Sequence, residues 1–267
     1  MLGLAVAAWC VAAAPLAGQA TSEGRGGPVW ILEGLRTGQC VRFLVDPTSA
    51  RQTLREPARL VPASQDESLH PALRRVIDGQ PEFATWIPSS LCLYYGDALT
   101  LGGRRYGGKD PRKRQMIGLW AVTASERDGG RRDVLLDFFA VGGGLVQAAA
   151  GAKVKLSEAQ SAVTKVPDTD NDLYDVRIGK TRLTWNGRAV GDSSMVEQPI
   201  QEAWLGKGTS GMVWRVQAIL KPEWSRPLVG VLSVEGKDDL AKALKASPIR
   251  FVGPRYSGGG GELRFSR

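Results

Sequence analysis

Four aspartates form the segment that comes nearest to a metal site. They stand at alternate or near-alternate positions: Asp168, Asp170, Asp172 and Asp175. A loop that curls around a hard cation can bring such carboxylates together, and Ca²⁺ takes six to eight oxygen ligands. Leu173 stands where an EF-hand needs its turn glycine, so this is not that motif. We expect no cofactor and take a solvated acidic loop as the first interpretation; the alternative prediction is a calcium site, and calcium is the only cofactor that the sequence suggests.

A basic segment is the second group that could do chemistry. It carries six cations in eleven residues: Arg104, Arg105, Lys109, Arg112, Lys113 and Arg114. Gly102 and Gly103 precede it as the turn of a predicted hairpin, because paired glycines supply the positive φ angles of a tight turn. Cations clustered at a hairpin tip attract phosphate, sulphate or an acidic partner. A mobile, protease-sensitive loop is the first interpretation, and an anion-binding loop is the alternative prediction.

The residue types exclude several familiar catalytic arrangements. His70 is the only histidine, and its place before Pro71 favours a helix cap or a packed structural role. Lys180 lies in a glycine-lysine-threonine sequence, but Tyr174 replaces the first glycine that a phosphate-binding loop requires. Residues 206–211 spell the dinucleotide fingerprint, but an alternating strand pattern follows where a helix is needed.

Cys40 and Cys92 each lie in an apolar, strand-like segment. The third cysteine, Cys10, lies within residues 1–20, which are predicted to be removed from the mature protein. Two cysteines in an oxidising compartment favour one disulfide. Two buried free thiols are the alternative, and the cysteine count excludes both a CxxC redox motif and a zinc cluster.

Aromatic and acidic side chains leave room for a sugar-binding role. Tryptophans in loop-like settings are the ones to test for stacking on a sugar ring: Trp86, Trp204 and Trp224. Two carboxylates about 5 to 10 Å apart suffice for glycoside hydrolysis. The acids that remain open for such a pair are Glu33, Glu197, Glu202 and Glu223.

The elements that must position these residues are mainly strands. Segments rich in β-branched and aromatic residues recur along the chain, beginning with 29–35 and 40–45. Helices are expected over 66–79 and 236–247, where acidic residues come first and a proline follows the end. Residues 145–160 are ambiguous between helix and strand.

Two turns complete the predicted outline. Asn186-Gly187 is the strongest hairpin-turn pattern in the chain, and Gly258–Gly261 is predicted as a loop between two terminal strands. We predict one antiparallel β-rich domain over residues 28–267, a sandwich or an open barrel, with two or three short α-helices.

Residues 1–20 predict a secretory signal peptide. They contain no charged side chain, run apolar from Leu2 to Leu16, and end with the small residues Gly18 and Ala20. Residues 21–27 are small, polar and glycine-rich, and indicate a flexible leader. No later apolar run is long enough for a transmembrane helix. We therefore expect a periplasmic or extracellular protein with no transmembrane span after cleavage.

Charge and location together bound the function. The formal net charge is +8 and the isoelectric point about 9.6, which in the cytoplasm would raise the question of nucleic acid. Export argues against nucleic acid and favours an anionic envelope polymer or another envelope protein as partner. The lack of a catalytic motif favours a non-enzymatic binding or structural protein of the bacterial cell envelope. The alternative is an exported hydrolase that cleaves glycans with paired carboxylates.

The signal peptide gives the first testable prediction. Native protein isolated from the producing cell should begin at Thr21, because the small residues before it fit a signal-peptidase site. Intact-mass measurement and N-terminal sequencing check this. A full-length amino end on the native protein would contradict both the cleavage and the export.

Overall fold

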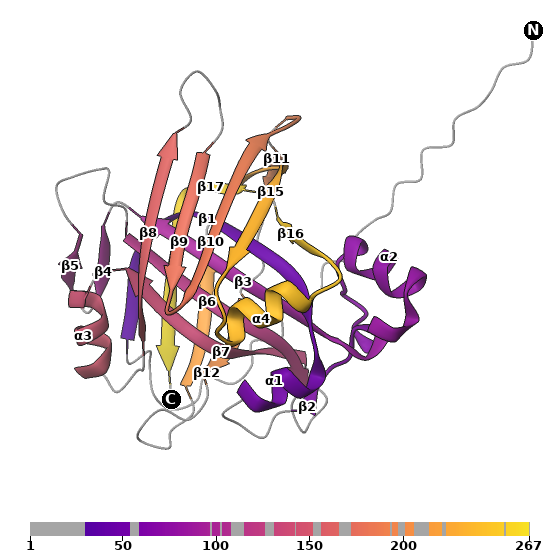
Figure 1. The fold of residues 1–267 in the computed structure, drawn as a ribbon. Coiled ribbons are helices and arrows are strands. Elements are labelled where there is room, and N and C mark those ends of the chain that lie inside the picture. The colour runs from indigo at the N-terminus through magenta and orange to yellow at the C-terminus, as the bar shows by residue number, and fades with distance from the viewer. Residues whose placement is uncertain are drawn as a thin grey trace, which may run out of the picture.

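The computed structural model describes most of the chain after residue 29. The described residues are 30–53, 59–96, 98–101, 103–107, 115–125, 131–141, 143–151, 156–165, 172–192, 194–196, 201–205, 214–220, 223–253 and 255–266. They form one large sheet, with short helices packed on it and at its ends (Figure 1).

Strands make up most of the described chain. They are β1 (Trp30–Val45), β2 (Arg59–Leu60), β3 (Ile87–Gly96), β4 (Leu99–Leu101), β5 (Arg104–Tyr106), β6 (Gln115–Ser125), β7 (Arg131–Val141), β8 (Ser157–Lys165), β9 (Asp172–Ile178), β10 (Thr181–Ala189), β11 (Ser194–Val196), β12 (Gln201–Leu205), β13 (Trp214–Leu220), β14 (Glu223–Arg226), β15 (Leu228–Glu235), β16 (Arg250–Val252) and β17 (Arg255–Ser266). The helices are α1 (Pro47–Thr53), α2 (Pro71–Gly79), α3 (Gly143–Gly151) and α4 (Asp239–Ala246), with 3₁₀ turns at Ala63–Gln65 and Pro81–Thr85.

Four strands form the centre of the sheet. β1 pairs with β3, β3 with β6 and β6 with β7, all antiparallel. β7 then has parallel neighbours at its two ends, β12 beside its first half and β8 beside its last residues. The sheet is therefore mixed, with antiparallel pairs in the majority.

From this centre the sheet curls back on itself. β1 pairs with β17, β17 with β13, β13 with β12, and β12 returns to β7 through Ala203–Leu205. The curl encloses an apolar core that includes Leu32, Phe138 and Phe265. We call this enclosed space the inner core.

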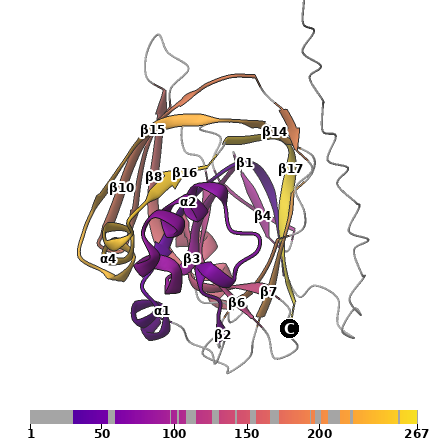
Figure 2. The same ribbon diagram turned by 90° about the vertical axis from the view of Figure 1, so that its right-hand side faces the viewer.

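A second group of strands covers the other face of the centre. β8, β9, β10 and β15 pair in that order and cross in front of β1, β3 and β6 (Figure 1). Helix α4 closes the lower end of this layer. Turned by 90°, β10 and β15 lie on one side of the central strands and β4 and β17 on the other (Figure 2). A second apolar core, with Trp185 and Phe139, fills the space between the layers.

The central strands are consequently buried on both faces. Met116 to Ala124 of β6 are all buried, which explains why this strand is a continuous apolar run instead of an alternating one. Gly118 leaves room for a neighbour: a Cβ there would lie 1.7 Å from Cε2 of Phe139. The two cores thus meet across one layer of strands.

One carboxylate joins helix α4 to the turn between β9 and β10. Asp238 caps the helix by accepting from the backbone N–H of Ala241 (3.1 Å). Its other oxygen accepts from the N–H of Lys180 (2.9 Å), and the Thr181 hydroxyl also donates to the carboxylate. A single cap therefore fixes both the helix and the hairpin that it covers.

The structure confirms the predicted class, a β-rich domain with a few short helices. The α2 helix is shorter than predicted: it starts at Pro71, and the chain from Asp66 to His70 leads into it. The ambiguous segment contains both alternatives, helix α3 followed by strand β8. Helix α1 was not predicted, and it brings the α-helices among the described residues to four.

Three local predictions were wrong. Asn186-Gly187 lies inside β10 and is not a turn, because both residues pair with β15 there. Gly187 lies opposite Gly230, where a Cβ on Gly230 would come within 1.7 Å of the Asn186 carbonyl oxygen. The two predicted strands at the start are one bulged strand, β1. Residues 258–261, predicted as a loop, lie inside β17.

Cys40 of β1 and Cys92 of β3 form a disulfide. The register of the two strands places them directly opposite each other, and both are buried beside the inner core. This arrangement fits the bond expected from the sequence.

Among the described residues, no helix is both long and apolar enough to span a membrane.

The disulfide gives the second prediction. The bond closes a separation of 52 residues, so a Cys40→Ala/Cys92→Ala variant should lose about 4 kcal/mol of unfolding free energy in the chain-entropy model. Urea unfolding with and without reductant measures the loss, and the double variant should not respond to reductant. Quantitative labelling of two free thiols in denatured, unreduced wild-type protein would contradict the bond.

Candidate functional site

The β4–β5 hairpin and helix α3 lie together at one end of the curled sheet (Figure 1). Tyr106 of β5 packs against the inner core. A Cβ on Gly144, in the first turn of α3, would lie 3.6 Å from Cδ1 of Tyr106, so the helix start contacts this ring. The guanidinium carbon of Arg104 lies 5.5 Å from the centre of the same ring. An arginine, an aromatic ring and a helix start therefore meet where the inner core ends.

The β4–β5 register decides which way each arginine of this hairpin points. Arg104 pairs with Leu101, and Arg105 pairs with Thr100. Leu101 belongs to the inner core, and cross-strand partners share a face of the sheet. Arg104 therefore stands on the inward face and Arg105 on the outward face, although both side chains are exposed.

The remaining cations of the predicted anion-binding loop lie outside the described residues: Lys109, Arg112, Lys113 and Arg114. They follow β5 and lead into β6 in the sequence. The described part of the loop thus places two of its six cations, Arg104 and Arg105, on opposite faces of one strand.

Lysines with described side chains all lie at the surface: Lys180, Lys237, Lys242 and Lys245. A lysine that acts as a nucleophile is activated by burial in an apolar pocket or by a neighbouring cationic group, and none of these four is buried. The lysines whose side chains are not described are Lys109, Lys113, Lys153, Lys155, Lys165, Lys207 and Lys221.

The predicted calcium segment falls largely outside the described residues. Asp168 and Asp170 lie outside them, and Asp172 is described only as part of β9. Within the described residues, no three His, Cys, Asp or Glu side chains come together as a metal site. The calcium site stays a prediction.

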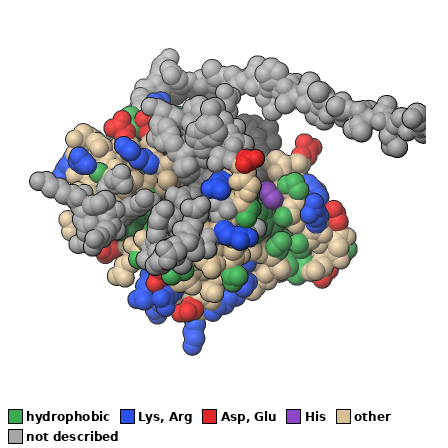
Figure 3. All heavy atoms as spheres, turned by 90° about the horizontal axis from the view of Figure 1, so that it is seen from above, with side chains coloured by type: hydrophobic (Ala, Val, Ile, Leu, Met, Phe, Trp, Pro, Cys, Tyr) green, Lys and Arg blue, Asp and Glu red, His purple; other side chains and the backbone are tan. Residues whose placement is uncertain are grey.

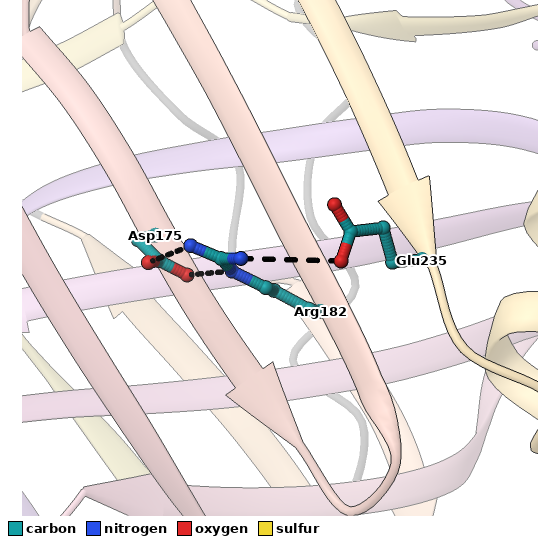
Figure 4. A network of polar contacts seen from close by, with 3 residues as sticks. All are labelled: Asp175, Arg182 and Glu235. Atoms are coloured by element: carbon teal, nitrogen blue, oxygen red, sulfur yellow. Dashed lines mark hydrogen bonds and ion pairs between the residues drawn. The ribbon is translucent and has the colours of Figure 1, made fainter.

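Asp175, the last of the four aspartates, is already paired. It accepts two hydrogen bonds from Arg182 of β10, at 3.0 and 2.8 Å, and Arg182 also lies 3.9 Å from Glu235 of β15 (Figure 4). The hydrogen bonds from Arg182 lower the pKa of Asp175, and the positive charges of Arg182 and Arg177 act in the same direction. A cation would have to displace this arginine to use Asp175.

A buried polar contact between the two layers was not predicted. Gln39 of β1 is buried, and its Oε1 accepts a hydrogen bond from Nε1 of Trp185 at 2.9 Å. The Trp185 indole stacks on the ring of Tyr174, with centroids 4.9 Å apart. This contact satisfies two buried polar groups and fixes how the layers sit. It is structural, and no local pattern marks it because its members come from β1, β9 and β10.

His70 has the structural role that its position before Pro71 indicates. Its Nδ1 accepts a hydrogen bond from the N–H of Ala72 at 3.2 Å and so caps α2. Its ring lies 4.7 Å from that of Phe251. Seen from above, the single histidine lies beside apolar side chains, with basic side chains around it (Figure 3). Burial first, and then the positive charge of Arg42, lower its pKa.

The other candidates do not form one site in the described part of the chain. Glu33 pairs across β1 and β17 with Glu262 on the outward face, and Trp86 is half-buried against Phe83. The side chains of Trp204, Trp224, Glu197, Glu202 and Glu223 lie outside the described residues.

The fold that carries this site is that of known enzymes. No protein-family model matches the chain, and no curated protein matches it in sequence. Among solved structures, the enduracididine biosynthesis enzyme MppR, in complex with pyruvate, aligns over 94% of this chain and 93% of its own, with a TM-score of 0.51 and 14% identity. An acetoacetate decarboxylase from Legionella pneumophila subsp. pneumophila str. Philadelphia 1 aligns over 90% of this chain and 85% of its own, with a TM-score of 0.51 and 11% identity. At these identities the likeness shows a shared fold.

This likeness overturns the function expected from the sequence. The expected non-enzymatic binding or structural role is wrong, because the fold is that of acetoacetate decarboxylase-like enzymes. The alternative of a glycan hydrolase is not tested by a shared fold and stays a prediction. The expectation failed because it took the lack of a catalytic motif in the sequence as a lack of catalysis, although catalytic side chains can come together from distant segments of a fold.

The third prediction concerns His70 and pH. Its pKa is lowered in the folded protein, so unfolding takes up a proton once the pH falls below about 6.5, the unperturbed histidine value. Stability contributed by neutral His70 is present above that pH and is lost as the pH falls toward the folded-state pKa. Wild-type unfolding free energy should therefore fall from pH 7 to pH 5.

His70→Asn is the matched control, because asparagine caps helices without titrating. Urea unfolding at several pH values should give a smaller loss for the variant, and equal pH slopes for the two proteins would contradict the prediction.

Proposed function

We propose that this protein is an enzyme acting on small oxo acids through an imine formed by one of its lysines. The observation that carries the proposal is the fold likeness over some nine-tenths of the chain to two enzymes, one solved with pyruvate and one an acetoacetate decarboxylase. Pyruvate and acetoacetate are both small acids with a ketone carbonyl. Lysine amines form imines with such carbonyls when the amine is neutral.

Lys109 and Lys113 are the lysines that we propose for this role. Neighbouring cations lower the pKa of a lysine, because each added positive charge disfavours the protonated amine, and acetoacetate decarboxylase is a known case of such activation. Lys109 and Lys113 lie in the segment with Arg104, Arg105, Arg112 and Arg114. The other lysines without described side chains have no comparable cluster of cations around them in the sequence.

The proposed chemistry uses the same positive charges twice. The lysine nitrogen adds to the carbonyl carbon and water leaves, which gives a protonated imine that withdraws electrons from the neighbouring carbon–carbon bonds. The cations around the amine favour its neutral form before the reaction and attract the anionic substrate from solution. The predicted anion-binding loop thus becomes part of a proposed active site.

The predicted signal peptide extends this proposal to location. An enzyme with residues 1–20 as its leader would meet its oxo acid outside the cytoplasm.

Reductive trapping tests the proposed function. Protein mixed with pyruvate or acetoacetate is treated with borohydride, which adds hydride to the imine carbon and leaves a stable secondary amine on the lysine. Trapping at pH 6 to 7 should modify one lysine, because ordinary lysines, with a pKa near 10.4, stay protonated there. Peptide mass spectrometry should place the adduct on Lys109 or Lys113.

Lys109→Gln and Lys113→Gln separate the two candidates, and Lys180→Gln is the control because Lys180 is exposed. One of the first two variants should lose the adduct, and with it any release of CO₂ from acetoacetate, while Lys180→Gln should retain both. The absence of an adduct on wild-type protein with either acid, at saturating concentrations, would overturn the lysine mechanism.

A further inference from the structure

We infer that Arg104 binds the carboxylate of the substrate and gives the site its preference for oxo acids over neutral ketones. This inference rests on the proposed function, and it names a residue that the fold likeness does not assign. Three properties of the side chain support the role: its direction, the ring beneath it and its available donors. A fourth support is the contrast with the neighbouring Arg105.

The direction in which the Arg104 side chain points follows from a row of residues that pair across four neighbouring strands. Arg104 of β5 lies opposite Leu101 of β4, Leu101 opposite Leu32 of β1, and Leu32 opposite Leu263 of β17. The three leucines are buried in the inner core, and partners in a row share one face. Arg104 therefore continues an apolar row at its outer end and places a cation at the rim of the inner core.

The ring of Tyr106, two residues further along the same face of β5, holds the Arg104 side chain in place. The guanidinium of Arg104 lies over this ring, with its carbon 5.5 Å from the ring centre. The ring in turn packs against the inner core and against the first turn of α3. A guanidinium that stacks on a ring keeps its N–H donors at the edge of its plane, where they can bind a carboxylate through two parallel hydrogen bonds.

Several other arginines among the described residues already have oxygen partners. The side chains of Arg182 and Arg264 pair with carboxylates, and those of Arg74, Arg226 and Arg250 donate to backbone carbonyl oxygens. Within the described part of the chain, no carboxylate pairs with Arg104. Its donors are therefore available to a ligand, whereas an arginine already in an ion pair would have to give up its partner.

Arg105 is the natural comparison because it carries the same charge one residue away. It lies opposite Thr100, which in turn lies opposite Glu33 on the outward face. Both arginines raise the positive potential near the hairpin equally, but only Arg104 faces the inner core. A role in long-range attraction would involve both, and a role in direct binding would involve Arg104 alone.

The experiment compares Arg104→Gln with Arg105→Gln, each of which removes one charge from the same hairpin. Pyruvate is titrated calorimetrically into the full-length protein at fixed ionic strength, with acetone as the neutral probe in borohydride trapping. Arg104→Gln should weaken pyruvate binding by about 10- to 100-fold, the range for a lost charge-assisted hydrogen bond. Arg105→Gln should stay within about twofold. Acetone carries no carboxylate, so the acetone concentration for half-maximal trapping should shift by the same factor in both variants, because each removes one of the cations proposed to favour the neutral lysine.

Arg104→Lys refines the result. A lysine keeps the charge but cannot form the paired hydrogen bonds, so binding should fall between the wild-type and Arg104→Gln values. Thermal unfolding of each variant checks that the hairpin change has not unfolded the protein. If Arg104→Gln is destabilised, Tyr106→Leu gives a second route, since it removes the support and leaves the arginine.

The outcomes separate this inference from the proposed function. Equal losses in Arg104→Gln and Arg105→Gln would overturn it, because they would show attraction by net charge alone. Unchanged pyruvate affinity in Arg104→Gln would also overturn it. Failure of trapping in the wild-type protein, with calorimetric binding still dependent on Arg104, would refute the lysine mechanism and leave the carboxylate site in place.

Discussion

The burial of β3 and β6 on both faces is the constraint on which the rest of the structure depends. An apolar strand that is covered on one face only would expose the other, at a cost of about 25 cal/mol for each Å² of apolar surface left in water. Here the curl through β17, β13 and β12 covers one face, and the β8–β9–β10–β15 layer with α4 covers the other. Gly118 shows how close this packing is, because the Phe139 ring occupies the space that a side chain would need.

Local physics made part of this fold predictable. The two clearest helices were found because acidic residues come first in each segment and a proline follows its end. The pairing of β4 with β5 was found because the glycine pair between them in the sequence has a strong turn preference. In each case the residues that determine the element are close together in the sequence.

The errors have a common physical cause. Asn186-Gly187 has the turn preference that the sequence indicates, but both residues pair with β15 and β10 continues straight through. The close approach of the two strands there requires a glycine at position 230, because a Cβ would collide with the Asn186 carbonyl oxygen. Likewise β1 continues past its bulges because its two halves find different partners, β17 and β3. Pairing between distant segments overrode local preference, and no window of sequence contains both partners.

At the candidate site, too, the sequence shows which residue types are present, but pairing between distant strands decides where each side chain lies. The cationic segment was identified from its composition, but which cations face the inner core depends on the β4–β5 register and on how β4 joins β1. That placement changes the chemistry. A carboxylate loses hydration when it approaches an apolar core, and it does so at tolerable cost only where a fixed cation replaces the lost water. The same low-polarity surroundings strengthen the attraction between the two charges. A cation at the rim of an apolar space therefore selects anionic ligands more sharply than the same cation on the outward face, and one residue's change of register would remove that selectivity.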